Sequence, residues 1–214
     1  MTIIQPIFRE GIMDMNFSAS TLAVAGALTL GASLLAPGAI AQTTQDGTWL
    51  DEETNWNVPG APIPLAPELE YSNLSECERT FRSPRLYEDA LVEAAGWTLT
   101  GPAYIFGDTT LVMGMANADG MCRPFSYQAF VFVDGDFAGT LSPNLMDSRT
   151  DGSLYDVRLY NDGSIDAFFN RYAPEDALCC ASAESRIFYN IESTDDGPLL
   201  VPQFPADTTD RPSP

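Results

Sequence analysis

The sequence contains no lysine and no histidine, so all 10 of its basic residues are arginines. Histidine has the side-chain pKa closest to neutrality and is the commonest transition-metal ligand, so its absence removes the usual general base and the usual metal ligand. The absence of lysine removes Schiff-base catalysis. Because there is no Gly-x-Ser-x-Gly motif either, a hydrolase of the Ser-His-Asp type is excluded. We therefore predict a protein that is not an enzyme and has no cofactor.

Positive charge is scarce, since 30 acidic residues face 10 arginines and the net charge is −20. Such a surface repels nucleic acid and anionic lipid, which excludes both as partners. Two interpretations of the acidity are open: solubility in a salty or extracellular setting, or cation binding by clustered carboxylates. The acids are spread along the chain, and this favours the first interpretation.

The N-terminal segment 1–41 has the pattern of a signal peptide. An unbroken apolar and small-residue run from Thr21 to Leu35 is followed by the small-x-small sequence Ala39-Ile40-Ala41. The run is shorter than the ~20 residues of a membrane span, although an N-terminal membrane anchor is the alternative. Met13 and Met15 are alternative start positions.

Cleavage after Ala41 would leave a mature chain of 173 residues with 28 acids, 9 arginines and a net charge of −19. This length suits one domain with disordered ends. We expect a protein that is exported to the periplasm or the extracellular space and is soluble after cleavage of its signal. Its partner in the envelope or outside the cell is unknown, and so is its oligomeric state.

Four cysteines lie in the mature part, at Cys77, Cys122, Cys179 and Cys180. An even number in an exported chain predicts disulfide bonds. A bond between the adjacent Cys179 and Cys180 forms a small strained ring, so we expect the two alternatives that join this pair to Cys77 and Cys122. The sequence does not distinguish those two alternatives. A redox-active vicinal pair and a zinc site are further hypotheses, and the zinc site lacks Cys-x-x-Cys spacing.

Proline and acid content divide the mature chain into three parts. Residues 42–72 read as a proline-rich extended arm, which Trp49 and Trp56 would dock onto the domain. Residues 73–193 form the domain. Residues 194–214 are rich in proline and acids, and the pattern predicts a disordered tail.

One helix is predicted within the domain, with Ser83 as N-cap, Pro84 at its first position and Gly96 at its end. Turn signals such as Asp134-Gly135 separate the remaining apolar runs into strands that pair as antiparallel hairpins. The predicted fold is α+β: a disulfide-stapled antiparallel β-meander of about seven strands with one packed helix. The expected strands are 97–106, 109–115, 127–133, 136–141, 154–160, 164–171 and 185–192.

The strand 127–133 is apolar on both faces, with Phe130 and Phe132 on one and Ala129, Val131 and Val133 on the other. Such a strand lies centrally in a sheet and is covered on both sides. We expect the helix to cover one face and the Trp-bearing arm to cover the other.

Several fragments of the domain resemble the LppP/LprE-like family of bacterial envelope lipoproteins, over residues 97–192. The resemblance implies an exported envelope protein of uncertain biochemical role, and it transfers no catalytic residue. No cysteine stands at the predicted cleavage site, so lipid anchoring is not carried over. The fragments are Asp119-Gly120-Met121-Cys122-Arg123-Pro124, Phe130-Val131-Phe132-Val133-Asp134-Gly135, Gly139-Thr140-Leu141-Ser142-Pro143, Met146-Asp147-Ser148-Arg149 and Asp151-Gly152.

Two pairs of carboxylates are candidates for chemistry. Asp134 and Asp136 belong to a hairpin turn, where an aspartate side chain forms hydrogen bonds with nearby backbone groups. We therefore assign them a structural role. Asp147 and Asp151 lie in a loop before Gly152 and are candidates for Ca²⁺, although EF-hand spacing is absent. Rival functions are thus a Ca²⁺-dependent binding module and a carboxylate-based hydrolase. If function lies in this region, we expect it in the loop 146–152.

Three other residue groups have a structural and a functional interpretation. Arginines 123, 149, 158 and 171 would bind an anion if they gathered, but in an acidic chain they are expected to pair with carboxylates. Met113 and Met115 share a strand face, and we favour core packing over copper binding. Exposed aromatic side chains in one row would form a binding patch, although core packing accounts for most of Tyr155, Tyr160, Phe168, Phe169 and Tyr172.

Overall fold

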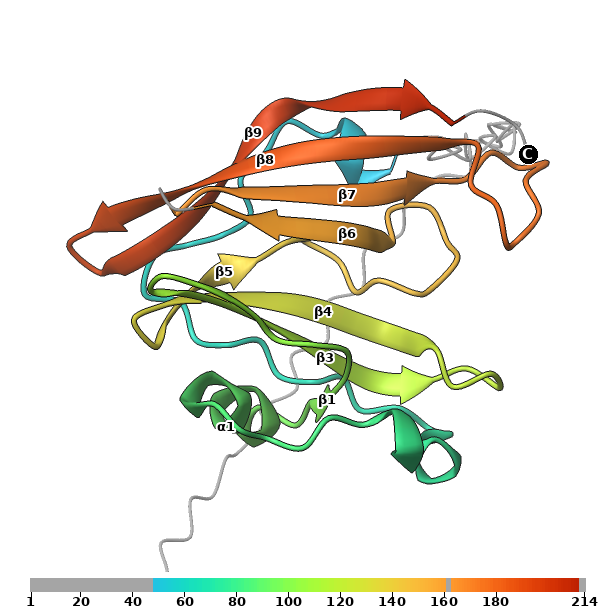
Figure 1. The fold of residues 1–214 in the computed structure, drawn as a ribbon, viewed down its shortest axis with the longest axis horizontal. Helices are drawn as coiled ribbons and strands as arrows, with labels where there is room; N and C mark the ends of the chain where they lie inside the picture. The colour runs from blue at the N-terminus through green and yellow to red at the C-terminus, as the bar shows by residue number, and fades with distance from the viewer. Residues whose placement is uncertain (1–47, 161–162, 212–214) are drawn as a thin grey trace, which may run out of the picture. The chain divides into compact units, whose positions relative to one another are not determined.

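The computed structural model describes residues 48–160 and 163–211 (Figure 1). The predicted signal peptide and the beginning of the arm lie outside the described residues. The described strands form two antiparallel sheets, one of five strands and one of four. The first sheet contains β1 (Thr98–Leu99), β2 (Tyr104–Phe106), β3 (Thr109–Ala118), β4 (Pro124–Val133) and β5 (Asp136–Thr140). The second contains β6 (Leu154–Leu159), β7 (Ile165–Arg171), β8 (Ala183–Thr194) and β9 (Gly197–Asp210).

The first sheet has the order β1-β3-β4-β5, with β2 also paired to β3. The β4–β5 hairpin turns at Asp134 and Gly135, whose φ angles of 50° and 87° are both positive. A type I′ turn requires two positive φ angles, and the Asp-Gly pair supplies them at low cost. The predicted turn is therefore confirmed.

A single meander of about seven strands was too simple a prediction. The described residues contain nine strands in two sheets. The expected strand 97–106 is two strands, because Gly101, with φ of 61°, and Pro102 interrupt it. The other expected strands correspond to β3–β8, and the ninth strand, β9, was not expected.

Strand β9 corrects the prediction that residues 194–214 are disordered. It pairs with β8 from Thr194↔Gly197 to Ala183↔Asp210, and Leu200 is completely buried in the core. Pro198, Pro202 and Pro205 lie on the edge strand of the second sheet, where a missing N–H group is tolerated, and Pro212 and Pro214 lie outside the described residues. The apolar residues 199–201 provide the burial that holds the strand in place.

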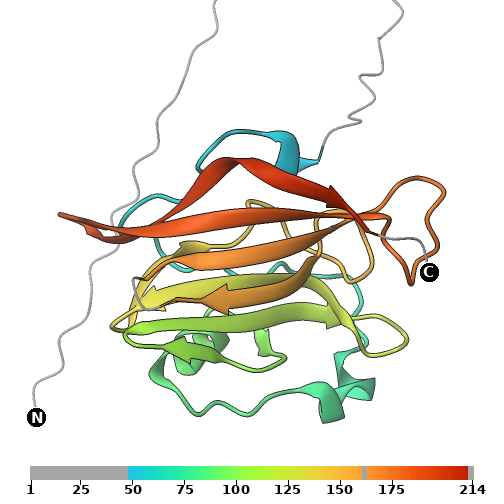
Figure 2. The ribbon, with the colours of Figure 1, turned by 45° about the horizontal axis from the view of Figure 1, so that its top comes forward.

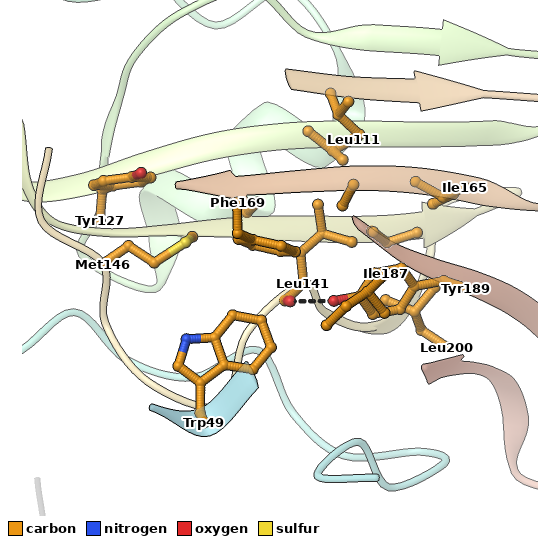
Figure 3. Close-up of a cluster of buried hydrophobic side chains, with 14 of the residues drawn as sticks. Trp49, Leu111, Tyr127, Leu141, Met146, Ile165, Phe169, Ile187, Tyr189 and Leu200 are labelled. Carbon is orange, nitrogen blue, oxygen red and sulfur yellow. Dashed lines mark hydrogen bonds between the residues drawn. The ribbon is translucent and has the colours of Figure 1, made fainter. Parts of the chain in front are cut away.

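The hydrophobic core lies between the two sheets, which pack face to face (Figures 1 and 3). Val131 of β4 and Phe169 of β7 belong to this cluster, and the buried Tyr189 hydroxyl donates a 2.5 Å hydrogen bond to the Leu141 carbonyl (Figure 3). A second cluster, which contains Phe130 and Phe132, lies on the opposite face of the first sheet. Strand β4 is therefore covered on both faces, as its sequence predicted.

Helix α1 (Tyr87–Ala94) covers the outer face of the first sheet, where Val92 packs in the cluster of Phe130 and Phe132 (Figure 1). The helix begins later than expected, so Ser83 is not its N-cap. The side chain of Asp89 instead accepts hydrogen bonds from the backbone N–H groups of Arg85 and Leu86, at 2.8 and 3.0 Å. These bonds satisfy backbone donors at the start of the helix.

The other face of β4 is covered by the second sheet rather than by the arm alone. The arm nevertheless docks through its two tryptophans, as predicted. Trp49, in the short 3-10 helix η1 (Trp49–Asp51), makes edge-to-face contacts with Phe169 and Trp56, with ring centroids 4.9 and 5.4 Å apart. The indole of Trp56 donates a 3.1 Å hydrogen bond to the Thr140 carbonyl.

Asn57 of the arm connects the edges of the two sheets. Its amide donates to the carbonyls of Thr140 on β5 and Leu200 on β9, at 3.1 and 3.0 Å, and its Oδ1 accepts from the Thr140 N–H at 2.9 Å. Gly139 allows this approach, because a Cβ atom there would lie 2.4 Å from the Asn57 Cγ. Residues of the arm thus complete the sandwich at its β5–β9 side.

Candidate functional site

The disulfide pairing differs from both expected alternatives. Cys77 is bonded to Cys122, with Cα atoms 5.3 Å apart, and Cys179 is bonded to its neighbour Cys180. Cys77 lies near Cys122 because the segment before it is tied to the end of β3, where the Asn117 side chain accepts the Asn73 N–H at 2.9 Å. The vicinal pair lies in the β7–β8 connection of the other sheet. The Cys77–Cys122 bond therefore ties the segment before β1 to the β3–β4 connection, and neither cysteine is bonded to the β7–β8 loop.

Asp134 and Asp136 occupy the exposed β4–β5 hairpin, and their role there is the predicted structural one. The carboxylates of Asp147 and Asp151 bind backbone N–H groups: Asp147 accepts from Ser126 at 2.6 Å, and Asp151 accepts from Tyr172 at 2.8 Å. Among residues 48–160 and 163–211, no group of three or more acidic, cysteine or histidine side chains is placed to hold a metal ion. The described residues therefore provide no set of ligands for the proposed Ca²⁺ site.

The loop 146–152, which was expected to be the place for function, forms one wall of a pocket of about 340 Å³. The opposite wall comes from the arm, and we name the cavity the arm–loop pocket. Sequence reasoning missed the arm's contribution, although a tryptophan among acidic and threonine residues was a usable signal. The lining residues are Thr48, Trp49, Glu52, Asn144, Leu145, Met146, Asp147, Thr150, Asp151 and Gly152.

The loop wall of the pocket is held rigidly by β4. The backbone N–H groups of Met146 and Tyr127 each donate to the other's carbonyl, at 2.9 and 2.8 Å. The Tyr127 hydroxyl accepts the Leu154 N–H at 2.9 Å, which fixes the far end of the loop. Because its backbone is tied at both ends, the loop presents its side chains in a preformed arrangement.

Trp49 provides an unused hydrogen-bond donor at the pocket wall. The residue is only 9% exposed, yet its indole N–H donates to no acceptor in the described part of the chain. The nitrogen lies against Gly152, where a Cβ atom would come within 2.7 Å of it, and the Gly152 φ angle is 78°. This donor is therefore free to pair with an acceptor atom of a ligand.

The charge around the pocket is mainly negative. Glu52, Asp147 and Asp151 line it, and Arg171 is the neighbouring cation, with its Nε 3.4 Å from the Asp151 carboxylate. Arg171 also binds Asp51 through two hydrogen bonds of 2.9 and 3.0 Å. An adjoining pocket of about 290 Å³ shares Thr48 and Asp151 and is lined by Arg171 as well.

Most of the remaining sequence candidates have the predicted structural roles, but Arg149, Tyr155 and Tyr160 do not. Arg123 pairs with Asp119, Arg158 with Asp156, and Arg171 with Asp51 and Asp151, whereas Arg149 is exposed and has no ion pair within the described residues. Met115 is completely buried, and Met113 packs against the same core. The side chains of Tyr155 and Tyr160 are exposed, but Phe169 is core and Phe168 lies beneath the guanidinium of Arg158 at 4.8 Å.

We expect the free energy of unfolding to be nearly constant between about pH 5 and pH 9 and to fall in acid. Apart from the terminal amine, no group with an ordinary pKa in that window exists, since histidine is absent and every cysteine is bonded. Four aspartates have a pKa below the ordinary 3.8: Asp51, Asp89, Asp119 and Asp176.

The physical causes of these lowered pKa values differ. The Arg171 hydrogen bond lowers the pKa of Asp51, and backbone N–H groups lower that of Asp176. At Asp89 and Asp119, burial acts to raise the pKa, but arginine and backbone bonds outweigh it. A lowered folded-state pKa stabilises the protein above pH 3.8, and this stability is lost as the pH falls through the folded-state values. Urea unfolding across pH checks this, and a stability step near neutral pH would contradict it.

Comparison with known proteins finds a similarity to one protein family. Residues 108–194, which run from the start of β3 to the end of β8, match the LppP/LprE lipoprotein family. The resemblance expected from the sequence is therefore confirmed, and the LppP/LprE match indicates an envelope protein. It includes the loop wall of the arm–loop pocket, whereas Thr48, Trp49 and Glu52 lie before it.

The LppP/LprE match gives no activity, ligand or partner. No curated protein and no solved structure matches the chain significantly. Within the described residues, no helix has the length and apolar character needed to cross a membrane.

Proposed function

We propose that the protein is a non-enzymatic binding protein of the bacterial envelope, acting in the periplasm or outside the cell, and that the arm–loop pocket holds its ligand. The observation that carries this proposal is the Trp49 indole N–H, which makes no hydrogen bond within the described residues and lies beside Gly152 at the wall of a preformed polar cavity. The volume of about 340 Å³ lies within the range of about 300–1,000 Å³ typical of ligand pockets.

The carboxylates of the pocket support binding rather than catalysis. Asp147 and Asp151 are already engaged by backbone N–H groups. Carboxylates held in this way are fixed acceptors for the hydrogen-bond donors of a ligand.

The chemistry of the lining selects the class of ligand. Carboxylate and hydroxyl groups on both walls, with the Asn144 amide on the loop wall, suit a small polyhydroxylated molecule, and its oxygen atoms can accept the free Trp49 N–H. Three carboxylates line the pocket, and the guanidinium of the adjoining Arg171 is already paired with Asp51 and Asp151, so the pocket repels anions. We therefore propose neutral or cationic polyols as ligands and exclude their acidic counterparts.

Three monosaccharides that differ mainly in charge test this proposal: glucosamine, glucose and glucuronate. Isothermal titration calorimetry of the protein is expected to detect binding of the cationic and neutral sugars at millimolar concentration, with no heat from glucuronate. The variant Trp49→Phe keeps an aromatic ring but removes the N–H donor. It should weaken binding by about threefold to tenfold, the value of one hydrogen bond.

Trp97→Phe is the matched control, because the Trp97 indole donates to the Pro64 carbonyl at 2.8 Å on the other side of the first sheet. Binding should be unchanged in that variant once its folding is verified by circular dichroism. Absence of heat with all three sugars would reject the ligand class. Binding that Trp49→Phe leaves unaltered, or a preference for glucuronate, would reject the arm–loop pocket as the site.

A further inference from the structure

The vicinal disulfide Cys179–Cys180 has no evident role in holding the fold. It joins neighbours in sequence, so it closes no loop and restricts the unfolded chain very little. Cys77–Cys122 is different, because it spans 45 residues and Cys77 is buried. The two disulfides therefore differ in their effect on the unfolded chain: Cys77–Cys122 constrains it, and Cys179–Cys180 does not.

The loop that carries the vicinal pair, residues 172–182 between β7 and β8, is closed by bonds that do not involve sulfur. The Asp176 carboxylate accepts the backbone N–H groups of Ala173 and Ser182, both at 2.8 Å, and so ties the two ends together. The Tyr172 hydroxyl donates to the Leu178 carbonyl at 3.1 Å. Because these bonds do not involve sulfur, we expect the loop to keep its place when the sulfurs change oxidation state.

Both sulfur-bearing residues are open to reactants. Cys179 and Cys180 are exposed, and the loop projects beyond the ends of the strands (Figures 1 and 2). Leu178, immediately before them, is 68% exposed and offers an apolar contact beside the bond. An exposed disulfide is the kind that exchanges with thiols, whereas a buried one is resistant.

We propose that Cys179–Cys180 is a thiol–disulfide exchange site that takes two electrons from a dithiol. One thiolate of the dithiol attacks the sulfur of Cys179 or Cys180, forming a mixed disulfide and releasing the other cysteine as a thiolate that takes up a proton. The second thiol of the reductant, deprotonated, then attacks its own partner sulfur in the mixed disulfide. The dithiol leaves as a disulfide, and this chain holds two thiols.

The charge of the surroundings selects the reductant. Glu175 and Asp176 stand in the same loop, and the chain as a whole carries a net charge of −20. An anionic monothiol such as glutathione is repelled by this field. A monothiol also cannot resolve the mixed disulfide within one molecule, whereas a dithiol can. The proposed reductant is therefore an uncharged or basic dithiol, either a small molecule or a protein with two reactive cysteines.

Titration of the intact protein with dithiothreitol tests the proposal, because Cys77–Cys122 serves as an internal control. After quenching with N-ethylmaleimide, peptide mass spectrometry reports the label on each cysteine. We expect Cys179 and Cys180 to be half reduced at a dithiothreitol concentration at least about tenfold below that needed for Cys77 and Cys122. Glutathione at the same thiol concentration should reduce the vicinal pair less.

Simultaneous reduction of both disulfides, or earlier reduction of Cys77–Cys122, would overturn the proposal. Equal reduction by glutathione and dithiothreitol would overturn the selection of the reductant. A second variant separates reactivity from stability: Cys179→Ser with Cys180→Ser should melt within about 2 °C of the parent protein. A much lower melting temperature in that variant would mean that the bond is structural and would refute its assignment as an exchange site.

Discussion

Replacing Asp89 with alanine is expected to lower the free energy of unfolding by about 3–5 kcal/mol, the usual cost of removing one partner of a buried ion pair. The Asp89 side chain is fully buried and binds both terminal nitrogens of Arg82, at 2.6 and 2.5 Å. It also accepts the backbone N–H groups of Arg85 and Leu86 at the start of α1. The substitution would leave a mostly buried guanidinium and two backbone donors without an acceptor.

Urea unfolding of Asp89→Ala and of Glu93→Ala provides the comparison. Glu93 belongs to the same helix but is exposed, so its removal should change stability by less than about 0.5 kcal/mol. Arg82→Ala completes a double-mutant cycle that isolates the pair. Equal effects of the Asp89 and Glu93 substitutions would show that α1 is not anchored through this carboxylate.

The second large effect is expected from Cys77→Ser combined with Cys122→Ser. The bond closes a stretch of 45 residues, for which chain entropy in the unfolded state gives about 4 kcal/mol. Because measured disulfide contributions scatter, we expect a loss of about 2–5 kcal/mol in the free energy of unfolding. The loss should be visible as a lower urea midpoint and as a lower melting temperature.

Cys179→Ser with Cys180→Ser is the matched control, since it also removes two sulfurs and one bond. Its free energy of unfolding should change by less than about 1 kcal/mol, because no loop is opened. A loss in the control as large as in the Cys77 and Cys122 variant would contradict the division of the two bonds into a structural one and a reactive one.

Local signals in the sequence predicted most of the strands, because hairpins depend on neighbouring residues. Asp134-Gly135 marked a turn whose two positive φ angles the structure contains. The alternation in 127–133 assigned Phe130 and Phe132 to one face and Val131 to the other, as the two clusters have them. The break at Gly101 and Pro102 was a local signal too, and it explains why one expected strand is two.

Long-range contacts were beyond such reasoning. The pairing of Cys77 with Cys122 depends on the hydrogen bond between Asn73 and Asn117. No residue spacing in the sequence indicates that hydrogen bond. Strand β9 was not predicted because it contains prolines, which a strand tolerates only at the edge of a sheet. That β9 lies at an edge cannot be known from the sequence. The loop 146–152 forms one wall of the arm–loop pocket, but the wall supplied by Thr48, Trp49 and Glu52 requires knowledge of where the arm docks.

The docking of the arm also sets an order of events in folding. Asn57 reaches Leu200 across 143 positions of the chain, and Trp56 reaches Thr140 across 84. Contacts this distant in sequence carry a large loop-closure entropy and slow the formation of the native state. Synthesis delivers the arm early, yet its acceptor on β9 emerges only near the C-terminus. Residues of the arm are therefore synthesised before their partner on β9 and can reach their final positions only after it.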